Sequence, residues 1–323
     1  MAGPPESTPA VLIARLLLPA GLDRLAASCE IREGGLDATP ERLRELAPGV
    51  AAIVSDPTVT VDEPLLEAAG PQLEIVANFA VGYDSIDLEA CRRRGVAVTN
   101  TPDVLTDATA ELALALTLAA ARRITEAEAD LRSGRWTGWD PGAHLGLELS
   151  GAIFAVVGSG RIGRRYAELV RPLAGEILYV GRRPQPDFER RLGAGRAGLA
   201  DALRLADVVS LHAPASPETR HMIGRDELAA MGPEAILVNA ARGSLVDSAA
   251  LAEALRDGSI GAAGLDVYED EPRVPADLLD APRCVLLPHI GSATARARDA
   301  MASTVADNVL AALAGTEPPN RVA

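Results

Sequence analysis

The sequence contains no lysine, and its 31 basic residues are all arginine. Schiff-base chemistry on a lysine amine is therefore excluded, as is a Walker-type phosphate loop that ends in lysine. Aromatic residues are also scarce, at only 3% of the chain. Alanine, leucine and valine must therefore form most of the hydrophobic core.

Cysteine is nearly absent as well. Cys29, Cys91 and Cys284 form no CxxC pair and no metal-like spacing with histidine, which predicts reduced thiols, a cytoplasmic location and no metal site. The N-terminus lacks the basic region and apolar run of a signal peptide. The longest apolar run, at residues 112–121, is too short to cross a bilayer. We therefore expect no membrane partner.

Acidic residues outnumber basic ones by 45 to 31, which gives a formal net charge of −14. This balance argues against a nucleic-acid partner or an anionic membrane surface. It does not exclude a small anionic substrate, because arginines in a cleft can reverse the local field. The length of 323 residues, of which 48% are hydrophobic, suits two globular domains.

Strand-like and helix-like segments alternate along most of the chain, which predicts parallel sheets covered by helices. One series is complete by Asn100, and a second begins at Gly151. We therefore expect an α/β protein with two domains, each a parallel doubly wound sheet. Residues 103–134 read as one long helix, which we interpret as a spine between the domains.

The segment 135–149 is expected to be an extended loop, and it contains both tryptophans, Trp136 and Trp139. Large aromatic side chains in such a loop indicate a dimer contact or a pocket wall. A tryptophan that simply fills a hydrophobic gap is an equally good interpretation.

A glycine-rich turn follows a buried strand at residues 152–157. Gly158, Gly160 and Gly163 have the G-x-G-x-x-G spacing, and the chain beyond them is compatible with a helix. The first glycine permits a tight bend, the second lets the backbone approach a pyrophosphate, and the third lets the helix pack close to the strand. The turn therefore predicts dinucleotide binding, with an ordinary strand-to-helix connection as the alternative.

The end of the next strand indicates which dinucleotide is bound. In NAD-binding sheets this strand normally ends in an acidic residue that holds the ribose hydroxyls. Here it ends in Gly181, Arg182 and Arg183 instead. Guanidinium groups pair with a 2′-phosphate that a carboxylate would repel. The sequence therefore favours NADP(H), with NAD(H) possible, and a solvated basic turn is the alternative.

Three polar residues each follow a predicted strand, at the sheet edge where such folds bind ligands. Arg242 offers a cation for an oxo acid, His289 offers a proton, and Glu271 offers a carboxylate to orient the imidazole. Taken singly, each is more often a surface or structural residue. His212 ends another strand and is a candidate for the cofactor groove, whereas His144 and His221 receive no catalytic role.

Five motifs occur in a fixed order: AVVGSGRIGRR, VSLHAPASPETRHMI, AILVNAARGSLVD, AAGLDVYEDEP and LLPHIGSAT. Together they resemble the D-isomer-specific 2-hydroxyacid dehydrogenase family, and the match extends from Ile75 to the end of the chain. Within that family, the segments IVANFAVGYDSID, TNTPDVLTDATAELALAL and SGRWTGWDP look most like the glyoxylate/hydroxypyruvate reductases. Phe79 and Ala80 depart from many relatives and leave the exact substrate open.

The resemblance implies a role for each matching residue. Arg242 would bind the substrate carboxylate and carbonyl, His289 would donate the proton in reduction, and Glu271 would be its partner. The other implied substrate contacts are the backbone amides of Val81 and Gly82, Ser292, and Trp139, which would reach the neighbouring subunit's pocket. The implied cofactor contacts, besides the glycine turn and the basic turn, are Ser159, Arg161 and Ile162 at the pyrophosphate, His212, Ala213 and Pro214 along the groove, and Ala240, Ala241 and Asp266 at the nicotinamide.

The resemblance also implies a Rossmann-type cofactor domain, residues 101–287, inserted into a smaller flavodoxin-like substrate domain formed by residues 1–100 and 288–323. The implied activity is NADPH-dependent reduction of glyoxylate and hydroxypyruvate to D-2-hydroxy acids, in a homodimer formed through residues 103–149. A 2-ketogluconate reductase or another D-2-hydroxyacid dehydrogenase is an alternative. A dinucleotide-sensing, co-repressor-like binding protein shares the fold and is the alternative outside the enzymes.

Overall fold

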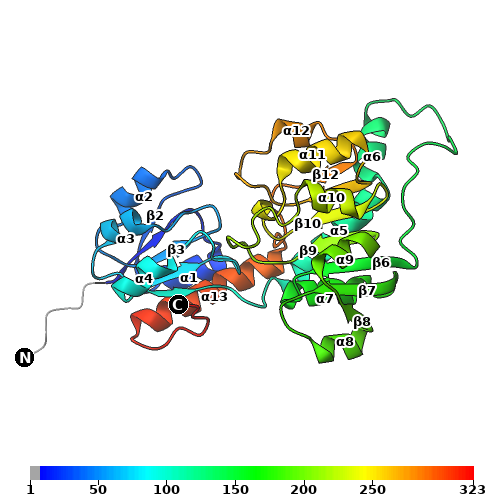
Figure 1. Ribbon diagram of the computed structural model, residues 1–323. Helices are drawn as coiled ribbons and strands as arrows, with labels where there is room; N and C mark the ends of the chain where they lie inside the picture. The colour runs from blue at the N-terminus through cyan, green and yellow to red at the C-terminus, as the bar shows by residue number, and fades with distance from the viewer. Residues whose placement is uncertain (1–7) are drawn as a thin grey trace, which may run out of the picture. The chain divides into compact units, whose positions relative to one another are not determined.

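The computed structural model describes residues 8–323, which divide into two compact units. Unit 1 comprises the described part of Met1–Leu105 together with Ser292–Ala323, and unit 2 comprises Thr106–Gly291. Each unit is a parallel sheet flanked by helices (Figure 1). The expected α/β class with two parallel sheets is therefore confirmed. In the described part of the chain, no helix has the length and apolar character needed to cross a membrane.

Unit 1 contains a five-stranded sheet in the order β2-β1-β3-β4-β5. Its strands are β1 (Ala10–Ile13), β2 (Glu30–Glu33), β3 (Val50–Ser55), β4 (Ile75–Asn78) and β5 (Ala97–Thr99). Its helices are α1 (Pro19–Ala26), α2 (Pro40–Leu46), α3 (Glu63–Ala69), α4 (Leu88–Arg94) and α13 (Ala295–Leu313). The C-terminal tail covers the free edge of β5, where the N–H of Val322 donates to the carbonyl of Val98 at 2.8 Å. Edge strands covered in this way have no unpaired backbone to offer another chain.

Unit 2 contains a seven-stranded parallel sheet in the order β12-β11-β10-β9-β6-β7-β8. Its strands are β6 (Ala152–Val157), β7 (Ala174–Val180), β8 (Ala194–Arg196), β9 (Val208–Leu211), β10 (Ile236–Asn239), β11 (Ala262–Leu265) and β12 (Cys284–Leu286). Its helices are α5 (Thr106–Ala121), α6 (Ile124–Arg132), α7 (Arg161–Val170), α8 (Pro186–Leu192), α9 (Leu199–Leu205), α10 (Arg225–Met231), α11 (Ser248–Asp257) and α12 (Ala276–Leu279).

The central strand β6 shows why this sheet is buried on both faces. Phe154 and Val156 belong to a core shared with α5 and α7, whereas Ala155 and Val157 belong to a core shared with α9, α10 and α11. Successive side chains of a strand point to opposite faces, so a strand covered on both sides must be apolar throughout. The continuous apolar run of β6 follows from this requirement.

The single long helix expected at residues 103–134 is wrong. The structure has two helices, α5 and α6, separated by Arg123 in the left-handed region with φ of +51°. The carbonyl of Ala121 accepts the N–H of Leu147 at 2.8 Å instead of continuing the helical ladder. A Cβ on Gly146 would lie 2.1 Å from that carbonyl, so the returning loop packs directly against the break. Helix α5 packs on α7 and on β10 and β11 within unit 2 rather than forming a separate spine.

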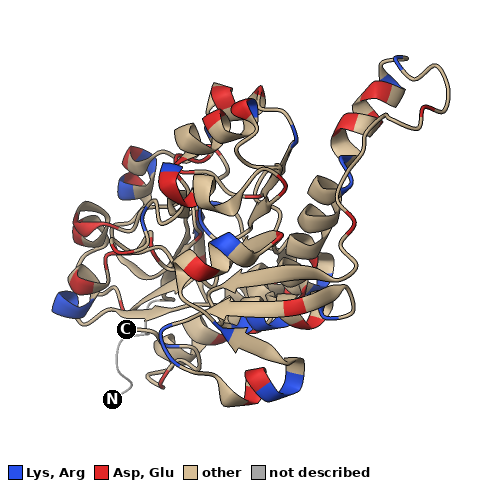
Figure 2. Cartoon of the chain, turned by 45° about the vertical axis from the view of Figure 1, so that its right-hand side comes forward, with Lys and Arg blue, Asp and Glu red and all other residues tan. Residues whose placement is uncertain are grey.

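Three further elements, α8, β8 and α12, were not expected from the sequence. All three are short, and they have no clear hydrophobic period. Elsewhere, arginine and acidic side chains alternate along the same helices (Figure 2). Several of these pairs are ion pairs three residues apart, such as Arg44 with Glu41. Exposed pairs of this kind contribute little stability, so the fold depends mainly on its cores.

A buried hydroxyl pair joins α5 to α7 and provides a test of this packing. The Tyr166 hydroxyl lies 2.8 Å from Oγ1 of Thr117, and Tyr166 is fully buried. We expect Tyr166→Phe to lower the free energy of unfolding by about 1 kcal/mol, because a buried hydroxyl partner is lost. Urea denaturation measures this, with Tyr83→Phe as the control, since Tyr83 is 38% exposed. Equal stability of the two variants would contradict the assignment.

Candidate active site

The glycine turn between β6 and α7 is a tight backbone crossing. Gly158 has φ of +101°, and a Cβ on it would lie 2.6 Å from the backbone of both His212 and Ala213. A Cβ on Gly163 would lie 2.1 Å from the Gly158 carbonyl. A Cβ on Gly160 would meet no described atom within 4 Å, so the backbone there is open to a ligand. The turn and the start of α7 therefore fit the pyrophosphate of a dinucleotide.

The end of β9 lies directly behind this turn and supplies His212. Its Nε2 lies 2.9 Å from the Ser210 hydroxyl, and its ring centroid lies 5.1 Å from that of Tyr166. Burial lowers the pKa of His212 to about 3, so the ring is neutral at physiological pH. The structure thus brings His212 and Ala213, two expected cofactor residues, against the glycine turn.

The basic turn that follows β7, Gly181 to Arg183, lies beside the glycine turn at Gly158 to Gly163. A Cβ on Gly181 would lie 2.7 Å from Oγ of Ser159, and Nε2 of Gln185 donates to that hydroxyl at 3.2 Å. Arg182 and Arg183 are exposed at this turn. The expected residues of the adenosine end therefore lie together around Ser159.

Arg242 is positioned by a loop that folds back from β10. The Asn239 side chain donates to the Arg242 carbonyl at 2.8 Å and accepts from the Ala241 N–H at 3.0 Å. A Cβ on Gly243 would lie 1.9 Å from the carbonyl carbon of Tyr268. No side chain fits there, so the Arg242 loop and the loop after β11 are in direct backbone contact.

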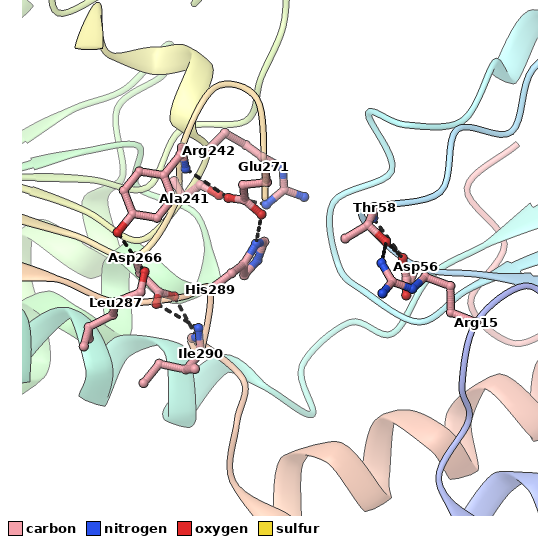
Figure 3. A network of polar contacts seen from close by, with 12 residues as sticks. Arg15, Asp56, Thr58, Ala241, Arg242, Asp266, Glu271, Leu287, His289 and Ile290 are labelled. Atoms are coloured by element: carbon pink, nitrogen blue, oxygen red, sulfur yellow. Dashed lines mark hydrogen bonds and ion pairs between the residues drawn. The ribbon is translucent and has the colours of Figure 1, made fainter. Parts of the chain in front are cut away.

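His289 and Glu271 form a close pair, with Nδ1 and Oε2 separated by 2.6 Å (Figure 3). The other carboxylate oxygen of Glu271 accepts the N–H of Tyr268 at 3.0 Å. Burial opposes ionisation of Glu271, but the hydrogen bond from His289, together with its charge, holds the pKa of Glu271 below its ordinary value. Both side chains are half-buried. With Nδ1 engaged, Nε2 of His289 is the nitrogen that remains for a reacting group.

Asp266 has a role at the site that the sequence did not reveal. The residue is 1% exposed, and its carboxylate accepts the N–H groups of Ile290 and Gly291 at 2.8 and 2.7 Å (Figure 3). Burial raises the pKa of Asp266, and these two hydrogen bonds oppose the increase. The carboxylate thereby fixes the backbone that follows His289.

The residues expected from unit 1 present backbone N–H groups. The carbonyl of Val81 accepts from Asn100 at 2.8 Å, and that of Gly82 accepts from Asn78 at 2.7 Å. Within residues 8–323, the N–H groups of Val81 and Gly82 donate to no protein acceptor. Ser292 is the first residue of the second segment of unit 1.

The two tryptophans lie in solvent. Trp136 is 62% exposed and Trp139 is 86% exposed. The interpretation that they fill a gap in their own chain is therefore wrong, because neither packs into a core. Their exposure leaves an external contact as the remaining interpretation.

A second histidine–glutamate pair lies outside the expected set. Nε2 of His221 is 2.7 Å from Oε2 of Glu269, and the other oxygen of Glu269 accepts the N–H of Ser248 at 3.3 Å. The N–H of His221 donates to the carbonyl of Ser244, in the Arg242 loop, at 2.8 Å. Sequence reasoning gave His221 no role, although Glu269 is two residues from Glu271. No group of three potential metal ligands is present among the described residues.

Comparison with known proteins shows the family to which the chain belongs. Residues 114–291 match the family model described as D-isomer specific 2-hydroxyacid dehydrogenase, NAD binding domain. The chain is 46% identical to a glyoxylate reductase of Thermococcus litoralis over 320 residues, which cover 97% of this chain and 96% of that protein. A glyoxylate reductase of Aeropyrum pernix is 44% identical over 321 residues, with the same coverage of each chain.

Solved structures are similar over the whole chain. An NADPH-dependent glyoxylate/hydroxypyruvate reductase from Sinorhizobium meliloti, in complex with NADP and malonate, superposes with a TM-score of 0.87 at 37% identity, covering 98% of this chain and 97% of that one. A protein of Thermus thermophilus gives a TM-score of 0.91 at 42% identity, covering 97% of this chain and 100% of that one. The binding-protein alternative finds no support among these relatives. The chain belongs to the D-isomer-specific 2-hydroxyacid dehydrogenase family and is an NAD(P)-dependent oxidoreductase that acts on a CH–OH group.

Proposed function

We propose that this enzyme is an NADPH-preferring reductase of small 2-oxo acids, with glyoxylate and hydroxypyruvate as its first substrates and D-2-hydroxy acids as products. The observation that carries the proposal is the His289–Glu271 pair, with a separation of 2.6 Å, next to the loop that carries Arg242. The relatives named as glyoxylate reductases support the substrate class. The basic turn at Arg182 and Arg183 supports the cofactor preference.

The proton is assigned to His289. When bound, the reduced nicotinamide supplies a hydride to the carbonyl carbon of the substrate. The carbonyl oxygen then takes the proton from Nε2 of His289, while Glu271 holds Nδ1 and fixes the ring's orientation. The carboxylate of Glu271 also stabilises the protonated ring before the transfer.

Arg242 is assigned to the substrate's carboxylate and carbonyl oxygen. A guanidinium can bind both oxygens through parallel hydrogen bonds and withdraws electron density from the carbonyl carbon. The N–H groups of Val81 and Gly82 suit a carboxylate, and Ser292 is proposed as a further substrate contact. These contacts recognise a 2-oxo acid by the two groups that all such acids share.

The cofactor is assigned to unit 2. The glycine turn with Ser159, Arg161 and Ile162 holds the pyrophosphate, and His212, Ala213 and Pro214 line the groove beside it. Ala240 and Ala241 provide backbone contacts to the nicotinamide, and Asp266 is assigned to its carboxamide. The neutral His212 adds no positive charge to this groove. Unit 1 is proposed as the substrate-binding unit.

A substrate and cofactor panel tests the proposal. Purified enzyme should oxidise NADPH at least about tenfold more efficiently than NADH with glyoxylate or hydroxypyruvate, because guanidiniums favour the 2′-phosphate. Absorbance loss would be followed with these two acids and with 2-ketogluconate, pyruvate and phosphohydroxypyruvate. No turnover with any oxo acid would refute the reductase assignment, and faster turnover with NADH would refute the cofactor preference.

The proton-transfer pair predicts a division between catalysis and binding. His289→Gln should lower kcat at least about 100-fold while the Kd for NADPH stays within about twofold, because the donor is lost and the cofactor contacts remain. Glu271→Gln should lower kcat by a smaller factor. Since the pKa of Glu271 lies below its ordinary value, its carboxylate is ionised throughout the neutral range, so this loss should be present at every pH from about 6 to 9.

The matched control is Glu253→Gln, which removes an exposed carboxylate that pairs with Arg225 at 2.5 Å. It should leave kcat unchanged. Equal losses of kcat and of NADPH affinity in His289→Gln would mean that the histidine is structural.

The exposed loop is assigned to a homodimer contact through residues 103–149. Trp139 and Leu145 are 86% and 69% exposed, which is a large apolar surface for a loop. Light scattering should show twice the chain mass for the native protein and a single chain mass for Trp136→Ser/Trp139→Ser. Leu36→Ser, at a site 59% exposed in unit 1, is the control. A monomeric native protein would disprove the assignment.

A further inference from the structure

The edge strand β8 brings a third arginine to the basic turn. Strand β8 pairs in parallel with β7, and Arg196, its last residue, lies opposite Tyr179. Carboxyl ends of parallel strands meet at one edge of a sheet, so Arg196 reaches the turn that follows β7. No sequence motif marks this position, because Arg196 is 14 residues from Arg182 along the chain.

The Arg196 guanidinium is attached to the backbone of that turn. Its Nε and Nη2 donate to the carbonyl of Gly181 at 3.2 and 3.1 Å, and Nη2 also donates to the carbonyl of Arg182 at 3.3 Å. The edge of the guanidinium formed by Nε and Nη2 therefore donates to two successive backbone carbonyls, those of Gly181 and Arg182. Within residues 8–323, Nη1 has no hydrogen-bond partner. The charge of Arg196 remains available to a ligand while its position is fixed.

Arg182, Arg183 and Arg196 form a cluster of guanidinium groups at this turn. Among the described residues, none of the three forms an ion pair with a carboxylate, although the chain as a whole carries a formal charge of −14. Arginines on the adjacent helix α8 behave differently, since Arg190 pairs with Asp187 and Arg191 pairs with Glu168.

The carboxylate next to this cluster is Glu189. It accepts the Tyr179 hydroxyl and the N–H of Gln185, and these hydrogen bonds lower the pKa of Glu189, with a smaller contribution from Arg196. In the part of the chain that the structure describes, Glu189 is thus hydrogen-bonded to neutral donors and interacts with Arg196 only at longer range, without an ion pair. Three guanidiniums at one exposed turn, none of them in an ion pair with a described carboxylate, are suited to binding a dianion.

We propose that Arg196 is a further determinant of cofactor specificity, acting with Arg182 and Arg183 on the 2′-phosphate of NADP(H). The inference rests on the proposed preference for NADPH and deepens it. Arg196 holds the backbone from which the Arg182 side chain leaves, and it adds a third positive charge beside the phosphate. An unphosphorylated ribose offers that charge no partner, so Arg196 contributes to NADPH binding and not to NADH binding.

Calorimetric titration of the whole enzyme with two fragments tests this assignment. Adenosine 2′,5′-bisphosphate carries the 2′-phosphate, and adenosine 5′-monophosphate lacks it. Arg196→Gln should weaken binding of the bisphosphate about tenfold and leave binding of the monophosphate within about twofold. The control, Arg204→Gln, removes an equal charge from α9, where Arg204 pairs with Asp201, and should change neither affinity.

The outcomes separate the two proposals. If the native enzyme binds both fragments equally, the preference for NADP fails, and the role of Arg196 fails with it. If the native enzyme prefers the bisphosphate and Arg196→Gln keeps that preference, only the role of Arg196 is overturned. Equal weakening of both fragments would assign Arg196 a purely structural role and would also overturn the proposal.

Discussion

The geometry of the candidate site depends on one buried charge, the carboxylate of Asp266. A carboxylate at 1% exposure would be strongly destabilising without partners, and it receives two backbone N–H groups, from Ile290 and Gly291. These amides stabilise the charge, and the charge in turn fixes the chain immediately after His289. The N–H of His289 itself donates to the Asp266 carbonyl at 2.9 Å. The backbone of His289 and of the two residues after it is therefore hydrogen-bonded to Asp266, at the end of β11. These bonds hold the imidazole in its direction toward Glu271.

Backbone contact, made possible by glycine, joins the remaining loops to this frame. At Gly243 the Arg242 loop touches the loop of Tyr268 so closely that a methyl group has no room. At Gly158 the cofactor turn touches the end of β9 in the same way. Such contacts leave little freedom for side-chain repacking to shift one loop against another. Three separate segments of the chain supply Arg242, Glu271 and His289. The close backbone contacts hold these segments in fixed positions within unit 2.

The sequence predicted what depends on local pattern. The apolar run of β6, the glycine spacing and the helix α7 were all expected, because each needs only neighbouring residues. Glu271 and His289 were expected near each other because both follow parallel strands, although the distance of 2.6 Å required the structure. The break at Arg123 was missed because it arises from a residue of the returning loop far along the chain, Leu147, which takes the Ala121 carbonyl. Strand β8 was missed because a strand of three residues is too short to show a hydrophobic period. The position of Arg196, its last residue, was missed for the same reason.

The loop after β11 holds two histidines through two glutamates, and the two pairs differ in what else their carboxylates contact. Glu269 divides its carboxylate among His221, the N–H of Ser248 and Arg220, which lies 3.5 Å away. The backbone N–H of His221 donates to the carbonyl of Ser244, in the Arg242 loop. The Glu269 carboxylate and the His221 backbone thereby join the loop after β11 to the segments around Ser244 and Ser248. The Glu271 carboxylate accepts the N–H of Tyr268, lies 2.6 Å from Nδ1 of His289 and also interacts with the charge of Arg242. The Glu269 pair therefore joins the Arg242 loop to the loop after β11, whereas the Glu271 pair interacts with the charge of Arg242, which is why we propose the Glu271 pair for proton transfer.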